Sequence, residues 1–172
     1  VGRTPLIKID NVWAKIESKN PSGSIKDRMV WYMVDQAEKS GKLRPGSKII
    51  EVTSGNTGIS FSMISALRGY EFTAVMPGSM SVERRRIMES MGANVITTPA
   101  KDDMKGALKK YKALIKEYPQ AWLPNQFENP HNAQAHEKGL GKEILRDKPD
   151  IQVFIAGMGT GGTLIGVAKA LK

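Results

Sequence analysis

The stretch from Lys48 to Thr98 alternates strand-like and helix-like segments over short loops, and this alternation constrains the fold more than any other feature. Apolar, β-branched runs predict strands at 48–52, 71–76 and 94–98. The segments between them predict helices at 57–68 and 81–91, each followed by a glycine that can end it. Strands joined in this way form right-handed βαβ units. The sequence therefore predicts an α/β fold of three layers, with a doubly wound parallel sheet.

The pattern continues toward both ends of the chain. Gly139 and Gly141 are weak points in one of the expected helices, since glycine lowers helix stability. The further elements that we expect are strands at 5–9, 12–16, 121–123 and 151–156, and helices at 24–40, 103–117, 132–146 and 163–172.

Composition narrows the class of protein. The 172 residues carry a formal net charge of +9, but the basic residues are interleaved with acidic ones, which favours a solvated surface or a small anionic ligand over nucleic acid. The chain lacks cysteine, and His131 and His136 do not share a helix face, so no metal site is expected. With no membrane-length apolar run and no signal peptide, we expect a soluble, cytoplasmic protein.

One lysine stands in an unusual place. Turn residues at 20–23 precede an apolar helical run, so Lys26 falls in the first turn of a helix, where the helix dipole disfavours a cation. A lysine held there tends toward its neutral amine, the form that attacks aldehydes to make a Schiff base. The alternative is an ordinary solvated lysine of a first helical turn.

Two glycine-containing loops follow expected strands, where ligands bind in parallel sheets. The first comprises Thr53, Ser54, Gly55, Asn56, Thr57 and Gly58. Its hydroxyls, amide and backbone N–H groups carry no fixed charge and suit a carboxylate or phenolate oxygen. The alternative is a polar turn that caps the next helix.

The second loop, 157–163, contains four glycines in Gly-Met-Gly-Thr-Gly-Gly-Thr and opens the last expected helix. Glycines let the backbone approach a ligand, and a helix N-terminus attracts phosphate. The loop lacks the ending of a nucleotide P-loop, and a dinucleotide fingerprint also needs an acidic residue about 20 positions later. The better hypothesis is a phosphate without a ribose contact. A neutralisable lysine, a polar loop and a phosphate loop together suit pyridoxal 5'-phosphate.

Five motifs resemble those of one family, in the same order and spacing. The chain resembles the cysteine synthases, which are O-acetylserine sulfhydrylases of fold type II among pyridoxal phosphate enzymes, with a tryptophan synthase β-like fold. The segment 80–85 resembles the B-type isoform. The motifs are Gly2-Arg-Thr-Pro-Leu6, Asn20-Pro-Ser-Gly-Ser-Ile-Lys-Asp-Arg28, Thr53-Ser-Gly-Asn-Thr-Gly58, Gln126-Phe-Glu-Asn-Pro130 and Gly159-Thr-Gly-Gly-Thr163.

The resemblance implies a role for each matching residue. Lys26 would hold the cofactor covalently and then move the substrate's α-proton. Asn56 would bond the ring hydroxyl of the cofactor. The substrate carboxylate would be bound by Thr53, Ser54, Asn56, Thr57 and Gln126. The cofactor phosphate would be bound by Gly159, Thr160, Gly161, Gly162 and Thr163.

The implied reaction is a β-replacement in which sulfide displaces acetate from O-acetyl-L-serine and gives L-cysteine, in a homodimeric enzyme. Family chains are longer, so the resemblance also implies a smaller domain at 20–130, with 1–19 and 131–172 as an incomplete larger domain. The sequence departs from the family pattern at Gly139-Leu-Gly-Lys-Glu-Ile144 and at Ala133. Alternatives are a non-catalytic fragment or degenerate homologue that only binds a ligand, and a related enzyme such as cystathionine β-synthase.

Overall fold

The structure, a computed structural model, describes residues 1–53 and 55–172. These residues form two compact units. We call Ala37–Asn125 the sheet unit and Val1–Gln36 with Gln126–Lys172 the lysine unit. The boundary between them falls inside helix α1 (Lys26–Lys39).

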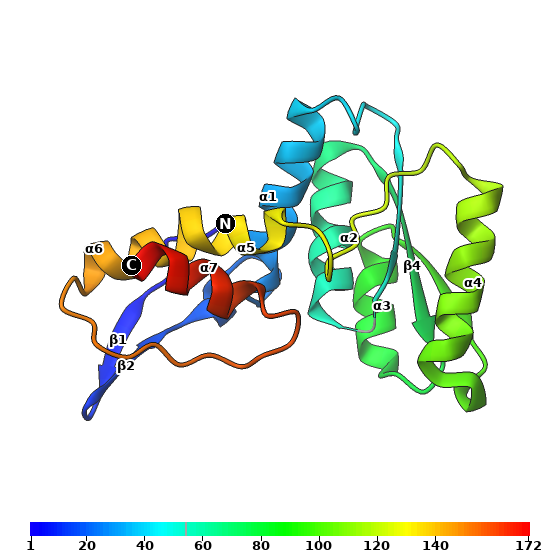
Figure 1. Ribbon diagram of the computed structural model, residues 1–172. Coiled ribbons are helices and arrows are strands. Elements are labelled where there is room, and N and C mark those ends of the chain that lie inside the picture. Colours follow the sequence, from blue (N-terminus) through cyan, green and yellow to red (C-terminus); the bar gives the residue numbers. More distant parts are fainter. Residues whose placement is uncertain (54) are drawn as a thin grey trace. The chain divides into compact units, whose positions relative to one another are not determined.

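The sheet unit is built around three parallel strands. β3 (Lys48–Val52), β4 (Glu71–Pro77) and β5 (Asn94–Thr98) lie in the order β3-β4-β5. Helices α2 (Asn56–Arg68) and α3 (Val82–Ser90) connect them. Figure 1 shows these two helices on one face of the sheet and α4 (Asp103–Glu117) on the other. The predicted three-layer α/β class with a parallel sheet is confirmed.

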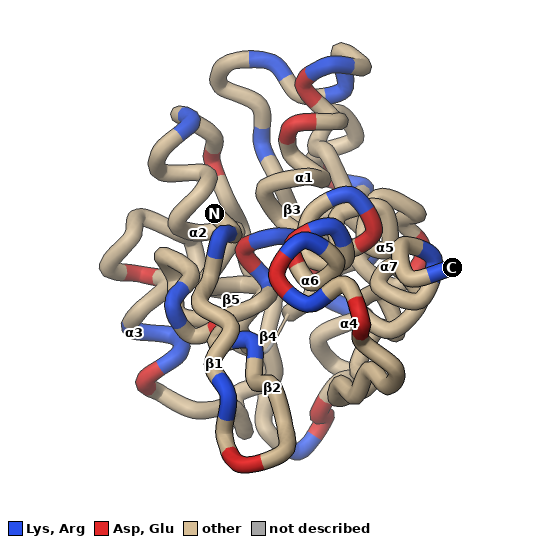
Figure 2. Tube along the Cα trace, turned by 90° about the vertical axis from the view of Figure 1, so that its left-hand side faces the viewer, with Lys and Arg blue, Asp and Glu red and all other residues tan. Residues whose placement is uncertain are grey.

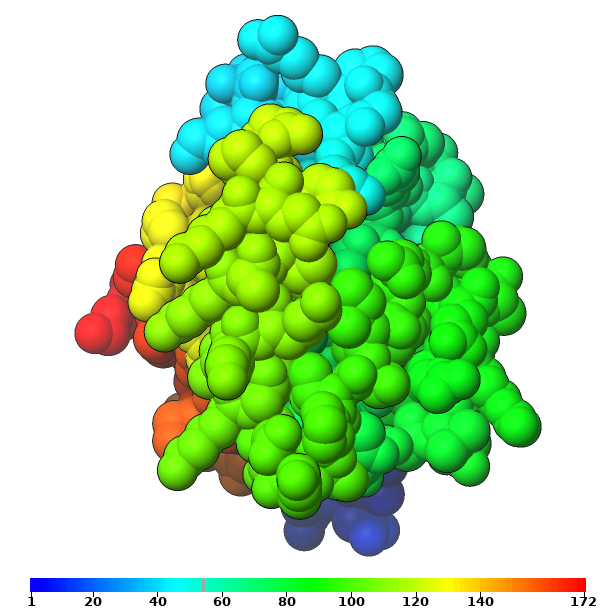
Figure 3. Space-filling model, turned by 90° about the vertical axis from the view of Figure 1, so that its right-hand side faces the viewer, coloured from blue at the N-terminus to red at the C-terminus, as the bar shows by residue number. Residues whose placement is uncertain are grey.

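Helix α4 explains the core on its side of the sheet. It buries Ala107, Tyr111 and Leu114, which are spaced by three or four residues, against Ile50 and Val75. Its opposite face is exposed and rich in lysine, and this face is the yellow-green surface turned to the viewer in Figure 3. The short 3-10 turn η2 (Ala100–Asp102) precedes the helix.

The predicted strand at 121–123 is present only as a single parallel bridge between Trp122 and Ile49. Two backbone hydrogen bonds hold it beside β3: Ile50 N–H to the Trp122 carbonyl at 3.1 Å, and Trp122 N–H to the Lys48 carbonyl at 2.9 Å. Pro119 and Pro124 bracket this segment, and proline has no N–H to extend a ladder. The pairing therefore stops after one bridge.

The lysine unit combines a hairpin with a layer of helices. Strands β1 (Leu6–Ile9) and β2 (Val12–Lys15) pair antiparallel. Near them are η1 (Glu17–Lys19) and the first eleven residues of α1, Lys26–Gln36. The later helices are α5 (His131–Ala135), η3 (His136–Gly141), α6 (Lys142–Asp147) and α7 (Gly162–Leu171). Figure 2 shows the charges that alternate in sign along α6.

Two predictions for this unit need correction. The expected single helix at 132–146 is instead α5, a π-helical stretch η3 and α6, and η3 contains both glycines predicted as weak points. The expected strand at 151–156 is wrong, because these residues lie in neither helix nor strand. A strand needs a neighbouring strand to hydrogen-bond, and in the described part of this unit the only sheet is β1-β2.

Candidate active site

Lys26 is the first residue of α1, as its turn-rich approach predicts. The Ser24 hydroxyl accepts the Lys26 backbone N–H at 3.2 Å, and Met29, Val30 and Met33 of the same helix are fully buried. The lysine side chain is half-buried, and loss of hydration lowers its pKa from the ordinary value. Burial thus favours the neutral, nucleophilic amine more than water would.

The glycine loop in the same unit is shaped to receive a ligand. Gly161 has a φ of 78°, a left-handed conformation that glycine adopts without strain, and it caps the N-terminus of the ten-residue helix α7. A Cβ on Gly157 or Gly159 would meet no atom within 4 Å, so the backbone is open on that side. Thr160 Oγ1 lies 3.4 Å from the Gly162 backbone N–H, and Thr163 adds a second hydroxyl to the loop. This donor set fits a phosphate group.

A buried amide connects two predicted site residues. The Nδ2 group of Asn132 donates to the backbone carbonyl of Gln126 and to Oγ1 of Thr160, both at 2.8 Å. Asn132 and Gln126 are buried. The structure therefore brings Gln126 and the glycine loop together through a residue that the motifs did not single out for a role.

A buried histidine contacts the same loop. His136 is 1% exposed, and its Nε2 is 3.3 Å from Thr163 Oγ1. Burial, together with the positive charges of Lys26 and Arg28, lowers the pKa of its ring to about 4. His136 is therefore neutral at physiological pH, and it is close enough to Lys26 to be affected by that charge.

The polar loop of the sheet unit is organised by Thr53. Its buried Oγ1 accepts the backbone N–H of Gly58 at 3.0 Å and thereby caps the start of α2. Thr57 is buried and Asn56 is exposed at the first helical position. A Cβ on Gly58 would lie 2.5 Å from the sulfur of Met88, so only glycine fits there. Ser54, also predicted here, lies outside the described residues.

The predicted site residues thus fall into two sets. Lys26, Gln126 and the glycine loop belong to the lysine unit, whereas Thr53, Asn56 and Thr57 belong to the sheet unit. Asn132 and His136 are the residues that sequence reasoning missed. Each is a polar residue on the buried face of its helix. A helical wheel that marks polar residues on an apolar face would have selected both.

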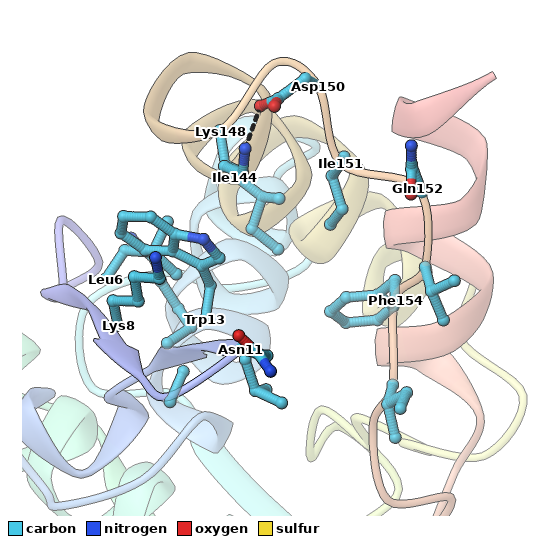
Figure 4. A pocket seen from close by; sticks show the side chains of 15 residues that line it. Leu6, Lys8, Asn11, Trp13, Ile144, Lys148, Asp150, Ile151, Gln152 and Phe154 are labelled. Atoms are coloured by element: carbon cyan, nitrogen blue, oxygen red, sulfur yellow. Dashed lines mark hydrogen bonds and ion pairs between the residues drawn. The ribbon is translucent and has the colours of Figure 1, made fainter.

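A separate cavity of about 870 Å³ lies between the β1-β2 hairpin and residues 150–155 (Figure 4). Its lining includes none of the predicted site residues. One edge carries the Lys148–Asp150 ion pair, with the Lys148 ammonium 5.9 Å from the Trp13 ring centroid. In the described chain no three acidic or histidine side chains gather in a way that could hold a metal. No described helix combines the length and apolar character needed to span a bilayer.

The parallel α/β unit, the half-buried lysine and the phosphate-type loop define an enzyme class that uses a phosphorylated aldehyde. The chain belongs to the family described as pyridoxal-phosphate dependent enzymes, whose family model matches residues 1–172. Its similarity to cysteine synthases and its fold type II architecture are confirmed by the relatives that follow.

Among curated proteins, the chain is 47% identical to a Flavobacterium cysteine synthase over all of this chain and 59% of the relative. It superimposes on cysteine synthase from Entamoeba histolytica with a TM-score of 0.95 and 40% identity, over 99% of this chain and 54% of that one. It also superimposes on an O-acetylserine dependent cystathionine β-synthase from Helicobacter pylori, with a TM-score of 0.92 and 39% identity over 99% and 59% of the two chains. The chain thus spans a little over half the length of these relatives.

Proposed function

We propose that the protein is a cysteine synthase that binds pyridoxal 5'-phosphate and replaces the acetoxy group of O-acetyl-L-serine with sulfide, giving L-cysteine and acetate. The observation that carries the proposal is the half-buried Lys26 with its lowered pKa, in the same unit as the glycine loop at the N-terminus of α7. The identity to cysteine synthases over the whole chain supports the choice of reaction.

Each predicted residue has a chemical task in this proposal. The loop from Gly159 to Thr163 holds the cofactor phosphate through its N–H and hydroxyl groups. The bound cofactor withdraws electrons from the substrate's α-carbon, which acidifies the α-proton and allows acetate to leave from the β-carbon. The Lys26 amine binds the cofactor at rest and then takes that α-proton as a base.

The polar loop and Gln126 would recognise the amino-acid substrate. The carboxylate is held by Thr53, Ser54, Asn56 and Thr57 together with Gln126, and Asn56 also bonds the ring hydroxyl of the cofactor. Thr53 supports this role because its oxygen already accepts the Gly58 N–H, so its own O–H is suited to donate to a carboxylate. Asn56 supports it by its exposure at the N-terminus of α2.

The remaining features belong to the same proposal. We place the enzyme in the cytoplasm as a homodimer, with 20–130 as its smaller domain and 1–19 and 131–172 as part of the larger one. The sheet unit, which lies wholly within 20–130, supports the central part of that division, whereas residues 20–36 group with the lysine unit. Sedimentation of the purified protein tests the dimer.

The first test of the proposal removes the amine. We expect Lys26→Ala to abolish the visible absorbance band of bound pyridoxal phosphate and to lower turnover by at least ~1000-fold, because both covalent attachment and proton transfer are lost. Lys39→Ala, at the exposed far end of α1, is the matched control and should keep both. Sulfhydrylase turnover retained in Lys26→Ala would contradict the proposal. A wild-type protein that shows the band but no turnover would instead be a binding homologue.

A second candidate function differs only in the sulfur compound that replaces the acetoxy group. The Helicobacter pylori neighbour is an O-acetylserine dependent cystathionine β-synthase. The same assay with homocysteine in place of sulfide separates the candidates, because a cysteine synthase should use sulfide with the higher kcat/KM.

A further inference from the structure

Asn132 occupies a position that two proposed ligand contacts share. Its Nδ2 group carries two protons, and one goes to the Gln126 carbonyl and the other to Thr160 Oγ1, each at 2.8 Å. The residue is 4% exposed, and its bond to the Gln126 carbonyl is buried while its bond to Thr160 is partly buried. These bonds join a residue proposed to bind the substrate carboxylate to a residue proposed to bind the cofactor phosphate.

The contact has a chemical effect on Thr160. Its hydroxyl oxygen accepts from Asn132 Nδ2 and, at 3.4 Å, from the Gly162 backbone N–H. A hydroxyl has two acceptor lone pairs and one proton. With both lone pairs engaged, the proton of Thr160 is left to donate, and a phosphate oxygen is a strong acceptor. Asn132 therefore sets Thr160 as a hydrogen-bond donor before any ligand arrives.

The Asn132 amide packs tightly against the glycine loop. A Cβ built on Gly162 would lie 2.0 Å from Asn132 Oδ1, so the amide packs directly on the backbone of the glycine loop. Among the described residues this buried oxygen has no hydrogen-bond partner. Burying an unpaired acceptor costs free energy, which indicates that the amide is held here for what its nitrogen does.

We propose that Asn132 is a positioning residue that couples the phosphate loop to Gln126, so that the cofactor and the substrate carboxylate are held in one arrangement. This inference rests on the proposed function, since it assigns a phosphate to the loop and a carboxylate to Gln126. The residue touches neither ligand in this scheme and acts through Thr160 and Gln126.

The test compares two cofactors that differ only in the phosphate. Pyridoxal phosphate and pyridoxal are titrated by absorbance into cofactor-free protein: wild type, Asn132→Ala, Asn132→Asp and the control Gln134→Ala, a half-buried amide of the same helix. We expect Asn132→Ala to weaken pyridoxal phosphate about 10-fold and to leave pyridoxal unchanged. Asn132→Asp should weaken pyridoxal phosphate binding more than Asn132→Ala does, because a carboxylate cannot donate a hydrogen bond to Thr160 and repels the phosphate.

Two further readouts separate positioning from general damage. The KM for O-acetylserine should rise in Asn132→Ala by a larger factor than kcat falls, because Gln126 loses its anchor. Backbone hydrogen exchange in cofactor-free protein should quicken at 160–162 and stay unchanged in β3 and β4. In a double-mutant cycle, Thr160→Val combined with Asn132→Ala should weaken pyridoxal phosphate binding by a clearly smaller factor than the product of the two single-mutant factors.

The outcomes distinguish this inference from the function on which it rests. Equal weakening of pyridoxal and pyridoxal phosphate, unchanged exchange at 160–162, or an Asn132→Ala protein that behaves like Gln134→Ala would overturn the inference while the Lys26-dependent absorbance band remains. A wild-type protein without that band, or one that binds pyridoxal as tightly as its phosphate, would overturn the proposed function and the coupling together.

Discussion

At the scale of single residues, the lysine unit holds an uncharged histidine in a positively charged neighbourhood. His136 packs beneath the glycine loop, with Lys26 and Arg28 as the nearby cations and Glu17 as the nearby anion. Burial keeps its pKa at about 4, well below that of an exposed imidazole. Folding therefore depends on His136 staying neutral.

This dependence predicts a loss of stability in mild acid. Between pH 6.5 and about 4 the unfolded chain binds a proton at His136 and the folded chain does not, so the free energy of unfolding falls as the pH falls through that range. The full effect is roughly 3 kcal/mol. Urea unfolding at several pH values measures it. His136→Gln should flatten the slope between pH 6 and 4.5, whereas His131→Gln should keep it. An unchanged slope in His136→Gln would rule the explanation out.

Sequence reasoning identified the chemistry of Lys26 but not its surroundings. The turn before the helix and the apolar run after it were enough to place this lysine at a helix start. Nothing local indicates that Asn132 reaches back six residues to Gln126 and forward 28 residues to Thr160. Such contacts depend on how helices pack, and spacing along the chain carries no record of that packing. The roles of the predicted site residues themselves stay predictions until the ligand experiments are done.

At the scale of elements, α7 lies unusually close to α5 and η3. A Cβ on Gly166 would sit 2.2 Å from the Ala133 carbonyl oxygen, and one on Gly141 would sit 2.4 Å from the Ala170 Cβ. Leu140 of η3, Ile144 of α6 and Val167 of α7 form the core between those three elements. Because α7 carries the glycine loop at its N-terminus, this close packing also fixes where the loop points.

Filling that contact should separate the helices. We expect Gly166→Ala to destabilise the protein by about 1–3 kcal/mol, because the neighbouring atom is backbone and cannot turn aside. Gly139→Ala is the matched control, since its added Cβ would meet only the Arg28 side chain at 3.8 Å, and it should be neutral or slightly stabilising. Thermal unfolding followed by circular dichroism compares the two variants. Equal melting temperatures would contradict the packing explanation.

The elements themselves were largely predictable, with failures that share a cause. Strands β3 and β5 and helix α4 begin and end where their patterns place them, because each has a clear apolar period and a glycine or proline stop. The segment 151–156 has an equally strong β pattern and is not a strand. Strand propensity is a property of one segment, whereas a strand forms only when two segments hydrogen-bond to each other.

At the scale of the whole molecule, a charged cluster is buried while some large apolar side chains are exposed. Arg28 is buried and binds Glu17 at 2.6 Å and Glu143 at 2.8 Å, which joins the segment before α1 to α6. The Glu143 carboxylate is partly desolvated, which alone would raise its pKa, but the hydrogen bonds from Arg28, Arg3 and Lys15 together outweigh this and lower the pKa to about 2. By contrast, Val153 is 73% exposed and Ile155 is 86% exposed.

The exposed apolar segment predicts self-association of the 172-residue polypeptide. Val153 and Ile155 are β-branched and unpaired, on an open stretch that also lines the large cavity. Replacing both, as Val153→Thr with Ile155→Lys, should raise the concentration at which light scattering first detects aggregates, without changing the far-ultraviolet circular dichroism. Val153→Ile, which keeps the apolar surface, is the control. Aggregation that is identical in all three proteins would contradict this prediction.

The contact between Asn132 and Gly162 also has an evolutionary consequence. With the amide oxygen 2.0 Å from the place where a methyl group would begin, Gly162 cannot gain a side chain while Asn132 remains. A lineage can change Gly162 only after shrinking Asn132, and that first step would release Thr160 and Gln126 together. Selection therefore constrains Asn132 and Gly162 jointly, although they are 30 residues apart in the chain.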